Sequence, residues 1–238
     1  MIDLLPTRTI NQLQKYFQRY DRTARENVKI IVTDMNYTYP KLAGTVFPNA
    51  IVIIDKFHII NALNRAFNRT RVRLMKGLPT SSREYHALKR YWKLVLKQVQ
   101  NLDYEIFKKR TNCLFPLTQT DVVDSLLATN SELKSTHTVM NQIRDAIQNK
   151  DWNNYNLAFW QDSNCSEEMK STLEVLEQHH NEIHNTLTHS YSNGPLEGTN
   201  NKIKAIKRAS FGYKSFWRFR IRVLFALRVH TEKALITK

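Results

Sequence analysis

The chain has 238 residues, of which 42% are hydrophobic and 11% are aromatic, and such a composition excludes a disordered protein because it can bury a substantial core. Its 36 Lys and Arg against 21 Asp and Glu give a net charge of +15, which favours a polyanionic partner such as nucleic acid or an anionic membrane; a basic protein without such a partner is the alternative. Two cysteines without a CxxC spacing indicate neither a disulfide framework nor a structural zinc site, and no apolar run approaches the roughly 18 residues that span a bilayer, so we expect a cytoplasmic protein without a membrane partner.

Two short β-branched runs near the start predict buried parallel strands, because continuous apolar runs of this length suit strands covered on both faces. They span residues 28–33 and 50–54, and an aspartate directly follows each of them. A helix is expected over residues 39–47 between them, and another over residues 9–20 before them. The order strand, helix, strand predicts a βαβ unit.

From Phe57 onward the pattern is helical almost to the end. Breaks are expected at residues 77–79, near Pro116, near Asn153 and at residues 193–195, where Gly, Pro or Asn interrupt the apolar period. The long helical stretch between the first and last of these breaks is either an insertion or a second domain.

Charge is distributed unevenly along the helical part. Residues 56–110 carry 14 basic and 3 acidic groups (+11), residues 111–196 carry 4 and 11 (−7), and residues 197–238 carry 11 and 2 (+9). The two separated basic segments predict one basic surface, with the acidic segment facing elsewhere.

Functional side chains of α/β sheets gather at the carboxyl ends of the strands, where Asp34 and Asp55 are expected. Taken alone, Asp34 is equally well interpreted as a helix N-cap. Asp55 and His58 share one face of the helix that follows, where they could bind metal, order a phosphate or tie the helix to the sheet. The alternative is that Asp55 caps this helix and His58 is an ordinary core histidine.

A Gly-Pro turn at residues 194–195 opens a predicted helix with a mixed polar face, formed by Glu197, Asn200, Asn201 and Lys204. A metal-binding carboxylate attended by amide and ammonium donors for a phosphodiester needs this mixture. The alternative is an acidic first-turn residue favoured by the helix dipole.

Residues 210–222 interleave aromatic side chains with lysine and arginine, a pattern that suits stacking on bases and gripping phosphates. A buried amphipathic helix with a basic outer face is the alternative. Four histidines, His179, His180, His184 and His189, could imitate a metal cluster, but no Glu follows His180, so we interpret them as ordinary helix surface.

Taken together, these blocks resemble the DDE transposases of bacterial insertion sequences, specifically the ISL3 group. The resemblance rests on Val-Thr-Asp34-Met, Phe47-Pro-Asn-Ala50, Asp55-Lys-Phe-His58 with Asn61-Ala-Leu-Asn-Arg65, and residues 193–204 running on to Phe211-Gly-Tyr213. Residues 2–6 are also similar to the family's third hairpin strand, which leads into its first helix.

The resemblance implies an α/β fold with an RNase H-like core, incomplete at its N-terminus, a long mostly helical insertion and a helical C-terminus. The parts would be a partial core over residues 1–75, the insertion over residues 76–190, and a catalytic Glu helix with a basic C-terminal helix over residues 191–238. Asp34 matches the family's second catalytic acid and Glu197 the third, both as metal ligands. Asp55 and His58 match an auxiliary signature.

The family's reaction is DNA strand cleavage and transfer, in which Mg²⁺ (or Mn²⁺) ions about 3.5 to 4 Å apart activate a nucleophile and stabilise the leaving oxygen. The partners implied are DNA, as terminal inverted repeats and target, for a nucleoid-associated protein, and a homo-oligomer stays open. The DNA-binding residues expected are Asn200, Asn201, Lys202, Lys204, Lys207, Arg208, Lys214, Arg218, Arg220 and Arg222.

In the family the first catalytic aspartate lies on a strand before the segment that begins here, so we expect an N-terminally truncated catalytic domain with weak metal binding and impaired cleavage. Asp3, on an expected edge strand, is a candidate substitute. Two other classes remain. A non-catalytic DNA-binding remnant predicts salt-sensitive binding without metal-dependent cleavage, and another RNase H-like nuclease or resolvase would need a complete acid cluster in the chain.

Overall fold

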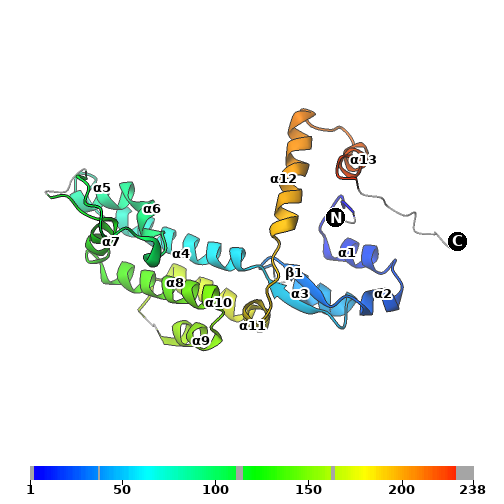
Figure 1. Cartoon of the computed structure of the whole chain (residues 1–238), viewed down its shortest axis with the longest axis horizontal. Helices are drawn as coiled ribbons and strands as arrows, with labels where there is room; N and C mark the ends of the chain where they lie inside the picture. The colour runs from blue at the N-terminus through cyan, green and yellow to red at the C-terminus, as the bar shows by residue number, and fades with distance from the viewer. Residues whose placement is uncertain (1–2, 37, 111–114, 162–163, 229–238) are drawn as a thin grey trace. The chain divides into compact units, whose positions relative to one another are not determined.

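A computed structural model describes residues 3–36, 38–110, 115–161 and 164–228 of the chain (Figure 1). The chain divides into two compact units: the first comprises Met1–Ile53 and Tyr191–Lys238, and the second comprises Ile54–Ser190. The first unit is therefore built from both ends of the chain, and the second from its middle.

The first unit holds the strands and the C-terminal helices. Its elements are α1 (Ile10–Phe17), α2 (Arg22–Glu26), β1 (Ile30–Thr33), α3 (Thr38–Val46), β2 (Ile51–Ile54, whose last residue is assigned to the second unit), α12 (Gly194–Ala209) and α13 (Phe216–Ala226). The two strands form a small parallel sheet, α3 packs on β1, and α1 packs on α3. The predicted strand, helix, strand order is confirmed, with both strands slightly shorter than the apolar runs.

No strand forms over residues 3–9, which have no regular secondary structure, so the expected edge strand near Asp3 is wrong for these residues. Two local features explain this. The Leu4 N–H donates to the Asp3 carboxylate at 2.6 Å, and Pro6 has no N–H to offer a strand ladder.

The second unit is helical in the residues that the structure describes, apart from an isolated antiparallel bridge between Lys108 and Leu117. Its elements are α4 (Lys56–Lys76), α5 (Arg83–Arg90), α6 (Trp92–Val95), a 3-10 helix (Val99–Asn101), α7 (Gln119–Leu127), α8 (Ser131–Asn149), α9 (Trp152–Gln161), α10 (Glu167–Glu177) and α11 (His180–Thr188). The long helix α4 packs against α5, α8 and α10, and α8 packs against α7 and α9. The whole chain is thus mostly helical, with a small parallel sheet that is compatible with an α/β class.

The core of the second unit is apolar and forms where α4 meets α8 and α10. Ile59, Leu63 and Phe67 of α4 are completely buried, and so are Leu133 and Met140 of α8. Spacings of four residues in α4 and of seven residues in α8 place each set on one helix face, which is why both helices bury one side.

Polar side chains join the same helices inside this core. The Thr70 and Ser166 hydroxyls lie 2.6 Å apart, and the Ser166 N–H donates to the Thr136 hydroxyl at 2.9 Å. The Arg71 guanidinium donates to the Leu88 carbonyl at 2.7 Å, which ties α4 to α5. Because buried polar groups are costly unless they are paired, these bonds fix how the helices dock.

Helix ends fall close to the predicted breaks. α4 ends at Gly77, α7 begins after Pro116, and α12 begins at Gly194. Thr118 and Asp121 form a capping box at the start of α7. Among the described residues no helix combines the length and apolar character needed to cross a membrane.

Candidate functional site

Asp34 directly follows β1, and its side chain is half-buried. Its carboxylate accepts a hydrogen bond from the Asn36 backbone N–H at 3.1 Å. The first turn of α3 is instead served by Asn36, whose side-chain oxygen accepts from the Thr38 N–H at 3.1 Å and from the Thr38 hydroxyl at 2.6 Å. The interpretation of Asp34 as the N-cap of α3 is therefore wrong, and the residue lies at the carboxyl end of a parallel strand, where α/β sheets commonly present functional side chains.

Asp55 follows β2 and has a structural task. Its side chain is 3% exposed and accepts the Phe57 N–H at 2.9 Å, so it is the N-cap of α4. His58 is half-buried, with its ring 5.9 Å from the ring of Phe57 in an edge arrangement. Both residues lie in the second unit, whereas Asp34 lies in the first.

Glu197 lies in the first turn of α12, and this helix buries none of its residues. The carboxylate is exposed, as are the side chains of Asn200, Asn201 and Lys204. Lys207 and Arg208 lie in the last turn. Acidic groups at the start and basic groups at the end complement the helix dipole, so this distribution also stabilises the helix. Glu197 and Asp34 belong to the same compact unit.

The described side chains do not form a complete donor set for a metal ion. Within the described residues, no group of three or more His, Cys, Asp and Glu side chains is arranged to hold a metal ion. His180 and His184 instead pack their rings against Trp152, with centroids 4.6 and 4.7 Å away. The interpretation as ordinary helix surface fits the exposed His184, but it is wrong for His179, which is buried.

The Asp3 carboxylate already has hydrogen-bonding partners. Its Oδ1 accepts from Arg220 Nε and Nη2, both at 2.7 Å, and its Oδ2 accepts from the Tyr16 hydroxyl at 3.0 Å. A carboxylate that is already paired with a guanidinium and a phenol is a poor metal ligand. This geometry therefore does not support Asp3 as a replacement for the family's first catalytic aspartate.

The basic residues expected to bind DNA divide into two kinds. Arg220 is held in the ion pair with Asp3, and its side chain is only 22% exposed. The others have exposed cationic side chains: Lys202, Lys204, Lys207, Arg208, Lys214, Arg218 and Arg222. Near them, Phe211 is completely exposed and has a positive φ of 51°, which is uncommon for a bulky residue.

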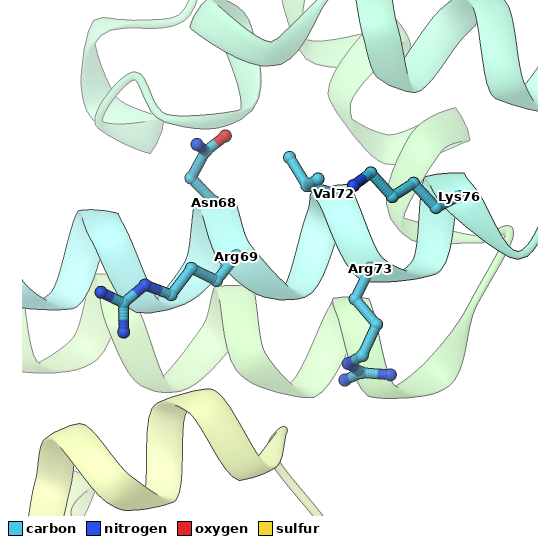
Figure 2. Close-up of a pocket in the computed structure, with 5 residues that line it drawn as sticks. All are labelled: Asn68, Arg69, Val72, Arg73 and Lys76. Atoms are coloured by element: carbon cyan, nitrogen blue, oxygen red, sulfur yellow. The ribbon is translucent and has the colours of Figure 1, made fainter.

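A second basic feature lies on α4, and the residue-level predictions missed it. A groove of about 410 Å³ runs along this helix, lined by Asn68, Arg69, Val72, Arg73 and Lys76 (Figure 2). Figure 2 shows Arg69 and Arg73 extending from one side of the helix, with Asn68 and Val72 on the other. Arg65 precedes the groove by one turn and is exposed.

The cations of α4 have different surroundings. Arg73 bridges Glu132 and Glu168, at 2.7 Å for Glu168, and the hydrogen bond from Arg73 holds the pKa of the Glu168 carboxyl at about 2. Arg71 is buried. Arg65, Arg69 and Lys76 are exposed and form no ion pair within the described part of the chain. Their spacing places them within an arc of about 40° on the helix, a signal that the sequence already contained.

Comparison with known proteins gives two curated relatives. A transposase for the insertion sequence element IS1001 from Bordetella parapertussis is 22% identical over 233 residues, which are 92% of this chain and 53% of that protein. An "ATP-dependent protease" from Lactococcus lactis subsp. lactis is 32% identical over 108 residues, 45% of this chain and 35% of that protein. The chain therefore spans between a third and about half the length of these relatives. No solved structure matches it.

The family comparison covers much more of the chain. The transposase family of the DDE type ISL3 matches residues 1–223, which include both strands, α4 and almost all of α12 and α13. The matched range therefore includes Asp34, Asp55, His58 and Glu197. The chain belongs to the ISL3 family of transposases.

Proposed function

We propose that this chain is the catalytic portion of an insertion-sequence transposase that cleaves and transfers DNA strands by a DDE mechanism. Asp34 acts as the second acid and Glu197 as the third, on an RNase H-like core that the helical insertion over residues 76–190 interrupts. Asp55 and His58, at the start of α4, are the auxiliary residues of the family's signature. The observation that carries the proposal is the family match over residues 1–223, which contains both acids.

The acids present do not by themselves form a complete metal site. The described residues offer no group of three donors, and Asp3 is paired with Arg220. We therefore derive no catalytic step through a metal ion. The proposal for this chain is an impaired enzyme, whose own residues supply two carboxylates and a basic surface that positions a phosphodiester backbone.

The DNA-binding part of the proposal rests on exposed, unpaired cations in both units. In the first unit they lie on α12 and α13, and in the second unit on α4. Contacts between such side chains and phosphates release counterions, so log affinity falls by roughly 0.9 per phosphate contact as log salt rises. The same contacts carry no base sequence information.

Binding to a duplex oligonucleotide, followed by fluorescence anisotropy across a salt series, tests this part. Charge reversal of Lys204, Lys207 and Arg208 is expected to weaken binding to all sequences and to reduce the salt slope by up to about 0.9 per lost contact. The matched control reverses three exposed cations of the same unit that lie outside α12, namely Arg8, Lys29 and Lys41. Equal losses in both variants would mean that only net charge matters.

The active-site assignment has a separate test that needs no activity. Asp34 and Glu197 are replaced by cysteine in a chain with Cys113→Ser and Cys165→Ala, and spin labels report their separation. We expect the two positions to converge to within about 10 Å, because a shared two-metal site allows no more after modest closure. A much larger separation would reject Asp34 and Glu197 as partners.

A non-catalytic DNA-binding remnant is the main alternative. Salt-sensitive DNA binding is expected for this remnant and for the proposed transposase alike, so the DNA-binding experiment does not distinguish them. With the family's first catalytic aspartate supplied on a preceding strand, metal-dependent nicking that Asp34→Asn abolishes would separate the two. A different RNase H-like nuclease or resolvase would need a complete acid cluster within the chain, which the described residues do not present.

A further inference from the structure

The first unit contains a cavity of about 390 Å³ that none of the proposed catalytic residues lines. It lies between the N-terminal segment, α1 and α13, and includes Gln12, Lys15, Tyr16, Arg19, Trp217 and Arg220 in its walls. Apolar residues 4–6 complete the wall on one side. The volume falls within the roughly 300 to 1,000 Å³ of typical small-ligand sites.

One wall of this cavity is held rigidly by a polar network. The Asp3 carboxylate accepts two hydrogen bonds from Arg220, both at 2.7 Å, and one from the Tyr16 hydroxyl at 3.0 Å. The Asp3 side chain is only 13% exposed. Burial, followed by hydrogen bonds to Tyr20 and Asp3, raises the pKa of Tyr16 well above its ordinary value, so its hydroxyl stays a neutral donor. The network connects residue 3 to residue 220, so the cavity forms only when both ends of the chain are folded together.

The remaining walls offer aromatic faces and free positive charge. Trp217 is 61% exposed, and the Arg19 guanidinium lies 4.4 Å above the ring centroid of Tyr16. Lys15 and Arg19 are exposed and form no ion pair among the described residues, whereas the single acid of the cavity, Asp3, is already paired. A cationic ligand or a purely apolar one would therefore find poor complementarity here.

An anion that carries a planar ring fits these walls best. Base stacking on aromatic side chains and phosphate contacts from Lys and Arg are the interactions that single-stranded nucleic acid sites combine. We propose that this cavity, the α1/α13 pocket, binds one nucleotide unit, with its base on Trp217 and its phosphate between Lys15 and Arg19. The pocket is a subsite separate from the two acids, and only the identification of its natural ligand as DNA rests on the proposed function.

The test uses the whole chain labelled with 5-fluorotryptophan, in which Trp217→Phe assigns one of the four fluorine resonances to Trp217. Titration with deoxyadenosine monophosphate is expected to shift this resonance to saturation and to leave that of Trp160 unchanged. Deoxyadenosine and inorganic phosphate, each carrying half of the ligand, are expected to bind at least tenfold more weakly.

Substitutions identify the two halves of the pocket. By calorimetry, which does not depend on the Trp217 resonance, Trp217→Ala is expected to weaken binding of deoxyadenosine monophosphate at least fivefold, within the range that loss of base stacking gives. Lys15→Ala with Arg19→Ala is expected to remove the preference for deoxyadenosine monophosphate over deoxyadenosine. The matched controls are Trp160→Ala, another tryptophan with 66% exposure, and Lys41→Ala, another exposed lysine of the first unit; both should bind normally.

A final comparison identifies the source of the nucleotide. A five-nucleotide single strand with an abasic centre, compared with the intact strand, shows whether the pocket accepts a base within DNA. Preference for the intact strand supports a strand site, and binding of the free nucleotide alone supports a soluble ligand. Absence of any Trp217 shift with every ligand, or equal losses in the control variants, would overturn the pocket. Neither result would alter the separate convergence test for Asp34 and Glu197.

Discussion

His137 is the residue whose environment most clearly couples folding to pH. The pKa of His137 is lowered from 6.5 to about 4, chiefly by burial; the hydrogen bond with the Val95 carbonyl at 3.1 Å opposes this shift, and the nearby Arg144 adds to it. The ring also packs 5.5 Å from that of Phe67. The folded second unit therefore holds this side chain neutral at pH values where an exposed histidine is charged.

This coupling predicts a loss of stability in mild acid. Between pH 6.5 and about 4 the unfolded chain binds a proton that the folded chain does not, so the free energy of unfolding falls as pH decreases, by up to about 3 kcal/mol. Urea unfolding at pH 7.5 and pH 5 measures the change. His137→Gln should reduce this dependence and His86→Gln, at an exposed position, should preserve it; an unchanged slope in His137→Gln would contradict the assignment.

At the scale of the element, α4 combines folding and binding in one helix. Arg73 connects it to Glu132 of α8 and Glu168 of α10, whereas Arg69, one turn earlier, is exposed and unpaired within the described residues. The two arginines are alike in charge and propensity and differ only in their partners. They therefore make a matched pair for separating stability from DNA affinity.

Arg73→Ala is expected to lower the free energy of unfolding by about 1 kcal/mol, because two carboxylates lose a shared guanidinium at a partly exposed site. Arg69→Ala should change stability by less than about 0.5 kcal/mol and should reduce the salt slope of DNA binding by up to about 0.9. Thermal unfolding and anisotropy on the same samples provide both values. If Arg69→Ala binds DNA normally, the groove on α4 is not a phosphate site.

Some of these elements could be predicted from the sequence, and others could not. Continuous β-branched runs and Gly or Pro punctuation placed β1, β2 and the ends of α4 and α12, because those signals are local. The strand expected near Asp3 was wrong because the Asp3 carboxylate accepts the Leu4 N–H and Pro6 offers no N–H to a strand ladder. The bond between Asp3 and Arg220 is a long-range contact that no local pattern reveals. The net charge of residues 56–110 indicated a basic surface, but only packing separates the buried Arg71 and paired Arg73 from the exposed Arg69.

At the scale of the whole molecule, the residues expected to be functional are divided between the two units. Asp34 and Glu197 belong to the unit formed from both chain ends, while Asp55 and His58 begin the helical unit. The chain folds into the first unit only when residues before Ile53 and after Tyr191 associate. Such a site depends on long-range contacts, and its acids cannot be brought together by local structure alone.

The last prediction concerns metal-dependent activity of this chain. Because the described residues offer no group of three donors, the two carboxylates should bind Mn²⁺ only weakly. The developing charge at phosphorus then lacks a stabilisation worth several kcal/mol, which lowers the rate by orders of magnitude. We therefore expect no specific nicking of duplex DNA with Mg²⁺ or Mn²⁺, and calorimetry with Mn²⁺ should give similar weak binding for the native chain, Asp34→Asn and Glu197→Gln. Tight Mn²⁺ binding or specific nicking that either substitution abolishes would show that the chain completes its own acid cluster, and Asp3 and Asp55 would be the first residues to re-test.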